Sequence, residues 1–72
     1  MMTYQIKIKG MSCQNCVRHV TEALTEIPGT INVKLSLEEN QAVVETQEKM
    51  DPQVFRQALE EAGYSMEDVA AS

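Results

Sequence analysis

Apolar and polar residues alternate near the N-terminus, where every second residue is apolar: Tyr4, Ile6 and Ile8. This period of two predicts a half-buried strand over residues 3–9, which Gly10 ends. The period then lengthens, and apolar residues recur at intervals of three and four: Val17, Val20, Leu24 and Ile27. Such spacing predicts a helix with one apolar face over about residues 14–26, which Pro28 and Gly29 end.

A second alternating segment follows, with its apolar positions again two residues apart: Ile31, Val33, Leu35 and Leu37. The polar run EENQ, residues 38–41, predicts a turn. Beyond the turn, a return strand is predicted from three residues spaced two apart: Ala42, Val44 and Thr46. We therefore expect these two strands to pair as a hairpin.

Asp51 and Pro52 predict the start of a second helix. Asp accepts hydrogen bonds from the free N–H groups of a first turn, and Pro is tolerated at the first helical position. The apolar face of this helix is formed by residues three and four apart: Phe55, Ala58, Leu59 and Ala62. Gly63 is predicted to end the helix.

The run YSMEDV, residues 64–69, predicts a last strand with Tyr64 and Met66 facing the core. Val69 falls out of this phase, so we expect the strand to be short. The order strand, helix, strand, strand, helix, strand is that of the α+β ferredoxin-like βαββαβ sandwich. In that fold both helices cover one face of a four-stranded antiparallel sheet. With no linker or repeat visible, we expect one domain over residues 1–72.

Eleven acidic residues against six basic ones give the chain a net charge of −5. This balance argues against a nucleic-acid partner, because phosphate binding relies on clustered Lys and Arg. It favours a basic protein surface as partner, with solubility as the alternative explanation. The N-terminus lacks the apolar core of a secretory signal, and no segment approaches a membrane span. We therefore expect a cytoplasmic protein that does not insert into a membrane.

The only two cysteines, Cys13 and Cys16, stand where the first strand gives way to a helix. A disulfide between them would close a tiny loop and restrain the unfolded chain little, so a stapling role is not expected. In a reducing cytoplasm, metal binding or redox chemistry is the usual role of such a pair. The positive end of the helix dipole and the unpaired N–H groups of its first turn favour ionisation of both thiols.

The number of available ligands favours Cu(I). A closed zinc site takes four ligands, whereas this chain offers two thiols and one imidazole, His19. We expect His19 to face solvent as an ordinary exposed residue. Cu(I) is soft, accepts two thiolates and leaves room for a third sulfur from a partner. The shortage of ligands thus provides a route for release.

The motif GMSCQNC, with the βαββαβ pattern around it, resembles that of the heavy-metal-associated domain. As a single domain of this kind, the chain is similar to the bacterial copper chaperones. The resemblance covers essentially the whole chain, from the first strand to AGYSM. Gly10 and Met11 ahead of the first cysteine make it more specific than a bare cysteine pair. Some relatives place a histidine between the cysteines, where this chain has Gln14 and Asn15, so no imidazole stands there to tune the thiols.

The resemblance implies that Cys13 and Cys16 bind the metal, and that Met11 packs beneath their loop without coordinating. Tyr64 stands where the last loop of the family approaches the metal. Its hydroxyl either hydrogen-bonds or shields a thiolate, or its ring is simply core material. Ser12 either caps the helix or hydrogen-bonds a sulfur.

The implied function is a Cu(I) metallochaperone rather than an enzyme, because no bond in a substrate is made or broken. The implied partner is a copper-transporting P-type ATPase, through its N-terminal metal-binding domains, or a copper-responsive regulator. We expect a monomer without copper, and a copper-bridged dimer where a second chain fills the unused coordination. Two alternatives remain, an excised metal-binding domain of a copper ATPase and a dithiol oxidoreductase. Thioredoxin-like oxidoreductases characteristically place a proline near their thiols. In this chain Pro28 and Pro52 occupy helix boundaries instead, which argues against the oxidoreductase.

Overall fold

Six elements follow one another in the predicted order of strand, helix, strand, strand, helix, strand. The computed structural model describes residues 1–71. The elements are β1 (Met2–Lys9), α1 (Gln14–Thr25), β2 (Thr30–Ser36), β3 (Gln41–Thr46), α2 (Pro52–Glu61) and β4 (Ser65–Ala71). The β2–β3 turn covers residues 37–40, one residue earlier than predicted, and Asn40 closes it with a positive φ of 51°.

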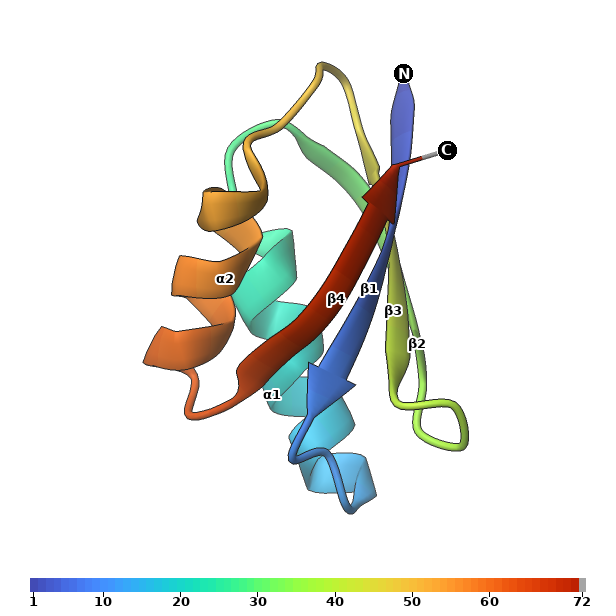
Figure 1. Ribbon diagram of the computed structural model, residues 1–72, viewed down its shortest axis with the longest axis vertical. Coiled ribbons are helices and arrows are strands. Elements are labelled where there is room, and N and C mark those ends of the chain that lie inside the picture. Colours follow the sequence, from blue (N-terminus) through green and yellow to red (C-terminus); the bar gives the residue numbers. More distant parts are fainter. Residues whose placement is uncertain (72) are drawn as a thin grey trace.

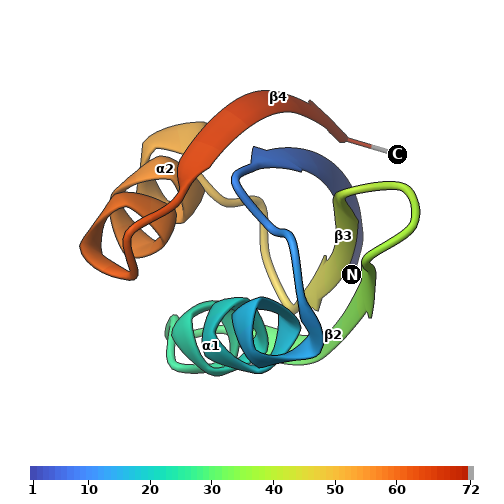
Figure 2. The same cartoon turned by 90° about the horizontal axis from the view of Figure 1, so that it is seen from below.

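The four strands form one sheet in the order β2-β3-β1-β4, and every neighbouring pair is antiparallel. Both helices lie on the same face of this sheet (Figure 1), and the sheet curves around them (Figure 2). The predicted ferredoxin-like sandwich is therefore confirmed. Figure 1 also shows that the β1–α1 loop, the β2–β3 turn and the α2–β4 connection lie at one end of the molecule, while both termini lie at the other.

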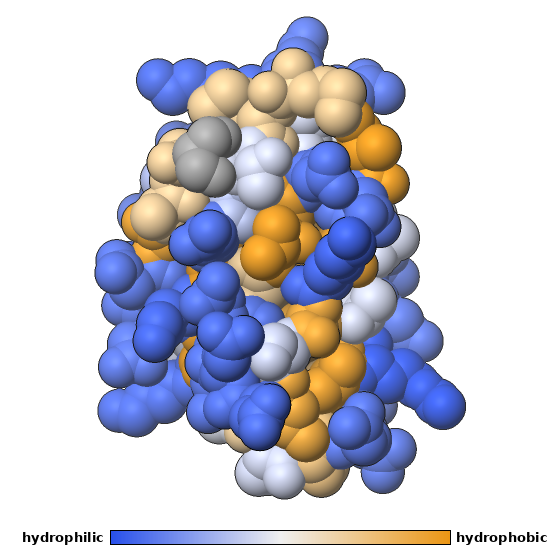
Figure 3. Space-filling model, turned by 90° about the vertical axis from the view of Figure 1, so that its right-hand side faces the viewer, coloured by the Kyte–Doolittle hydropathy of each residue, from blue (hydrophilic) through white to orange (hydrophobic). Residues whose placement is uncertain are grey.

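The core lies between the sheet and the helices. Its buried apolar residues come from both layers: Tyr4, Ile6, Ile8, Met11, Val20, Leu24, Ile27, Ala42, Val44, Phe55 and Leu59. Most of the inward positions predicted from the alternation and from the helical period thus form one cluster or pack against it. On the sheet side of the molecule, hydrophilic side chains cover most of the surface, with a strip of hydrophobic ones between them (Figure 3).

The second helix begins and ends as its sequence predicts. The side chain of Asp51 accepts a hydrogen bond from the backbone N–H of Gln53 at 2.9 Å, and Pro52 is the first helical residue. Gly63 follows the last turn with a φ of +93°, a backbone angle that glycine adopts without strain. These local signals fix where α2 starts and stops.

Ile31 does not face the core as the alternation predicted. In the pairing of β2 with β3, Thr30 lies opposite Thr46 and Asn32 lies opposite Glu45, so Ile31 is an extra residue. This bulge removes Ile31 from the inward phase, and its side chain is 47% exposed. Ile31 therefore lies outside the core, although it belongs to the same alternation as Val33 and Leu35.

The last strand is longer than predicted. Between β1 and β4, Ile8 lies opposite Met66 whereas Lys7 lies opposite Asp68, which leaves Glu67 as the bulged residue. The bulge shifts the phase by one and returns Val69 to the core face, opposite Ile6. The phase break read from the sequence was real, but it marks a bulge inside β4 rather than the end of the strand.

Within residues 1–71, neither helix has the length and apolar character needed to cross a membrane.

Candidate metal centre

The two cysteines meet at the N-terminus of α1. Gly10, with a φ of +101°, turns the chain out of β1 into the loop. Cys13 occupies the N-cap position in an extended conformation, and Cys16 lies in the first helical turn. The two sulfur atoms are 3.3 Å apart. Both are free thiols, that of Cys13 exposed and that of Cys16 half-buried.

Several hydrogen bonds favour the ionised form of Cys16. The backbone N–H of Ser12 contributes most, followed by the hydroxyl of Tyr64 and the thiol of Cys13, while burial acts in the opposite direction. A smaller contribution comes from the backbone N–H of Cys13. Together they lower the pKa of the Cys16 thiol from 9.0 to about 6. Cys16 is therefore mainly a thiolate at neutral pH, which is the form that binds soft metals.

Tyr64 reaches Cys16 from the α2–β4 connection. Its backbone N–H donates to the carbonyl oxygen of Leu59 at 2.8 Å, which holds the connection against the end of α2. Its ring lies over Gly10, where an added Cβ would stand 3.6 Å from the ring. The hydrogen bond to Cys16 raises the pKa of Tyr64, and burial and the charge of the cysteines raise it further. The ring also packs against the core, while a role for Tyr64 beside a bound metal stays a prediction.

Met11 and Ser12 support the loop in different ways. The side chain of Met11 is 6% exposed and packs in the core, as expected for a residue that anchors the loop from beneath. In the described part of the chain, the N-cap residue of α1 is Cys13 and no side-chain cap is present, which leaves the alternative that Ser12 acts on a sulfur. Ser12 acts instead through its backbone N–H on Cys16. Every residue except proline has a backbone N–H, so this contact could not be predicted from the residue type.

The charged residues near the loop are exposed. Lys9, Arg18 and His19 are all exposed, as predicted for His19. Hydrogen bonds rather than either cation account for the lowered pKa of Cys16. Among residues 1–71, no group of three or more His, Cys, Asp and Glu side chains is arranged to hold a metal ion. The structure thus brings together two sulfurs at the positive end of a helix, with solvent on their open side.

Comparisons with known proteins agree on the family, and several of the similar proteins are named for copper. The model of the heavy-metal-associated domain matches residues 5–65. The copper chaperone CopZ of Enterococcus hirae is 37% identical over 67 residues, which cover 92% of this chain and 97% of that protein. Copper-transporting ATPase 2 of Rhizobium meliloti is 36% identical over 58 residues, which cover 81% of this chain but only 7% of the ATPase.

Among solved structures, the N-terminal domain of PacS from Synechocystis superposes with a TM-score of 0.84 at 29% identity, covering 94% of this chain and 96% of that domain. The shared fold, the matched segment and the cysteine motif at its start agree with the resemblance read from GMSCQNC. The chain belongs to the heavy-metal-associated domain family.

Proposed function

We propose that this chain binds Cu(I) through the sulfurs of Cys13 and Cys16 and carries it in the cytoplasm to a copper-transporting P-type ATPase. The observation that carries the proposal is the pair of sulfurs 3.3 Å apart at the exposed mouth of α1. Cu(I) is a soft ion that accepts thiolate ligands, and Cys16 is already ionised near neutral pH. Most Cys16 thiols therefore need not lose a proton when the ion binds.

The small ligand set supports Cu(I) over Zn(II) as the cargo. Zinc in closed protein sites takes four ligands, and among the residues described here no third His, Cys, Asp or Glu joins the two sulfurs. Two-coordinate Cu(I) keeps an open side toward solvent, where another sulfur can approach. The small number of protein ligands thus disfavours Zn(II) and favours Cu(I) that can be transferred to a partner.

Transfer proceeds by exchange of thiolates. A thiolate of the partner forms a bond to Cu(I), and one bond from Cu(I) to this chain breaks, so the number of electrons on the metal is unchanged. The released Cys16 sulfur stays an anion, because the N–H of Ser12 and the hydroxyl of Tyr64 stabilise it. No proton need be delivered at the moment of release.

The similar proteins support a role in copper handling. The match to a copper chaperone covers nearly the full length of both chains, and the same domain occurs within copper-transporting ATPases. We infer that the recipient is such an ATPase, through its own metal-binding domains, with a copper-responsive regulator as the second recipient. Without metal the chain is a monomer, and Cu(I) in excess bridges two copies.

A second candidate is that this domain serves within a copper-transporting ATPase. The match to the Rhizobium meliloti ATPase, at nearly the same identity as the match to the chaperone, favours this alternative. Cu(I) would then pass between domains of one protein. The coding sequence on either side of the gene distinguishes the two.

A third candidate is a dithiol oxidoreductase, because a free thiol with a lowered pKa beside another thiol suits disulfide exchange. Equilibration with glutathione buffers, together with turnover on a disulfide substrate, tests it. Turnover comparable with that of a known oxidoreductase would replace the metallochaperone proposal.

The decisive test of the main proposal is an anaerobic titration of the reduced protein with Cu(I) against a coloured Cu(I) chelator, and in parallel with Zn(II). We expect one Cu(I) per chain and much weaker Zn(II) binding. Cys13→Ser or Cys16→Ser should weaken Cu(I) binding by more than the roughly 10- to 100-fold that loss of an outer partner costs. His19→Ala is the matched control and should leave affinity unchanged. Equal affinity without both sulfurs would overturn the proposal.

A further inference from the structure

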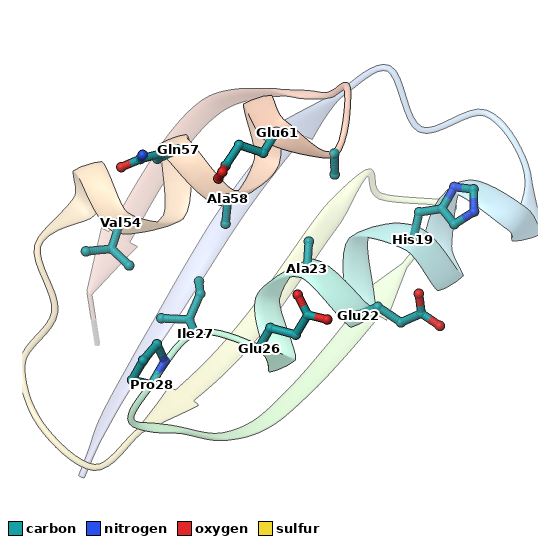
Figure 4. Close-up of a pocket in the computed structure, with 11 residues that line it drawn as sticks. His19, Glu22, Ala23, Glu26, Ile27, Pro28, Val54, Gln57, Ala58 and Glu61 are labelled. Carbon is teal, nitrogen blue, oxygen red and sulfur yellow. The ribbon is translucent and has the colours of Figure 1, made fainter.

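A groove runs between the two helices (Figure 4). Its apolar floor is formed by small or partly buried side chains from both sides: Ala23, Ile27, Val54 and Ala58. Figure 4 shows the methyl groups of Ala23 and Ala58 directed into the space between the helices. The groove has a volume of about 580 Å³. It begins at His19, one turn beyond Cys16, and runs away from the cysteines along the remaining length of α1, about 9 Å.

Carboxylates form the rim of this groove. Glu22 stands on α1, Glu26 is the C-cap residue of α1, and Glu61 stands on α2, all of them exposed. Among the described residues, none of these three side chains forms an ion pair or a hydrogen bond. An apolar floor between unpaired carboxylates is complementary to a partner surface that is apolar along its centre and basic along its edges.

We propose that this groove docks a basic amphipathic helix of a partner protein. A helix suits it better than an extended segment, because the backbone groups of both walls are already bonded within α1 and α2 and offer no ladder to a strand. The alanines of the floor allow a third helix to approach closely. The acidic rim repels nucleic acid and anionic lipid, and the net charge of −5 opposes a second copy of this chain.

Docking in this groove extends the proposed function. It rests on that function, because copper transfer requires a partner. The docked helix would end near His19 and so bring the partner next to the β1–α1 loop, where its thiolate can reach the metal. The carboxylates act mainly on the rate of encounter and on orientation, and the apolar floor supplies the burial.

The test uses the metal-free protein and a synthetic amphipathic peptide about four turns long, with Leu and Ala on one face and Lys on both flanks. A matched peptide carries Glu in place of every Lys. Amide NMR spectra should show shifts for residues of α1 and α2 that line the groove, with binding that weakens as salt is added. Shifts centred on the sheet, or equal binding of the Glu peptide, would overturn the proposal.

Variants of the protein sharpen the test. Glu22→Gln with Glu61→Gln removes two exposed rim charges and should weaken binding of the Lys peptide about fivefold. The matched control, Glu38→Gln with Glu39→Gln in the β2–β3 turn, makes the same charge change away from the groove and should alter binding less than about twofold. Equal weakening in both would show general attraction to an acidic protein and refute specific docking.

Ala58→Leu fills the floor of the groove and should weaken peptide binding at least about tenfold. Its amide NMR spectrum must show an intact fold; if it does not, the variants of Glu22 and Glu61 decide the question. Sedimentation without peptide checks for a second copy, and a dimer that uses the groove would contradict the proposal. Failure of Cu(I) binding with intact peptide binding would refute the proposed function alone. Intact Cu(I) binding with no peptide binding would refute the docking helix alone.

Discussion

Replacing Tyr64 with Phe removes one hydroxyl from the candidate metal centre. The hydroxyl of Tyr64 is the second largest of the influences that lower the pKa of Cys16 to about 6. Phe keeps the ring over Gly10 and against the core, so the loop should keep its shape. We expect the pKa of Cys16 in Tyr64→Phe to rise from about 6 toward its ordinary value, while the N–H of Ser12 still holds it below that value.

The size of the effect follows from the ionised fraction of the thiol. With a pKa of about 6, about 90% of Cys16 is thiolate at pH 7, and about 10% at pH 5. Because the thiolate is the nucleophile, the rate of alkylation should fall about tenfold between these two pH values. An unperturbed thiol would lose about a hundredfold over the same interval. In Tyr64→Phe the midpoint should move to higher pH and the rate at pH 6 should drop.

The assay is alkylation of the reduced, metal-free protein by iodoacetamide across pH 5 to 9, with tandem mass spectrometry to separate the label on Cys16 from that on Cys13. The matched control is Tyr4→Phe, which removes a hydroxyl that bonds Met50 near the other end of β1. That variant should keep the midpoint of Cys16. An unchanged midpoint in Tyr64→Phe, or a wild-type midpoint near 9, would refute the reasoning.

Three further predictions concern stability. The pKa of Cys16 is lower in the folded chain, so between pH 6 and 9 the unfolded chain binds more protons. Urea denaturation should therefore show a free energy of unfolding that rises with pH over this window, and this stabilisation should be lost as the pH falls toward 6. Asp51→Ala removes the 2.9 Å bond to Gln53 and should cost about 1 kcal/mol in thermal unfolding, whereas Asp51→Asn should retain most of it. Phe55→Ala should cost about 3–5 kcal/mol, because Phe55 is fully buried with its ring centroid 5.1 Å from that of Tyr4; a loss under 1 kcal/mol would contradict this packing.

Sequence periodicity located every element of the fold. The apolar phase of β1, the face of α1 and the start of α2 at Asp51 were all confirmed, because each depends on residues a few positions apart. The phase failed at Ile31 and at Val69. Each error comes from a β-bulge, and a bulge exists only relative to the partner strand.

The candidate site divides in the same way. The motif around Cys13 and Cys16 indicated two converging thiols at a helix N-terminus, and the structure brings their sulfurs together. That these sulfurs bind the metal stays a prediction. The lowered pKa of Cys16 could not be assigned its causes from sequence, since the main donor is a backbone N–H and the next is the hydroxyl of Tyr64, a residue of a different loop.

The sequence by itself determined the order of strands and helices, the inward faces of most of them, the family and the pair of candidate ligands. These features depend on the spacing of residues close together in the chain, which a single sequence shows directly. The tertiary structure alone decided the two bulges, the ionisation of Cys16 and the acidic groove between α1 and α2. Each of these arises where segments distant in the chain approach one another. Hydrogen bonds and burial act over a few ångströms in space, whatever the separation in sequence.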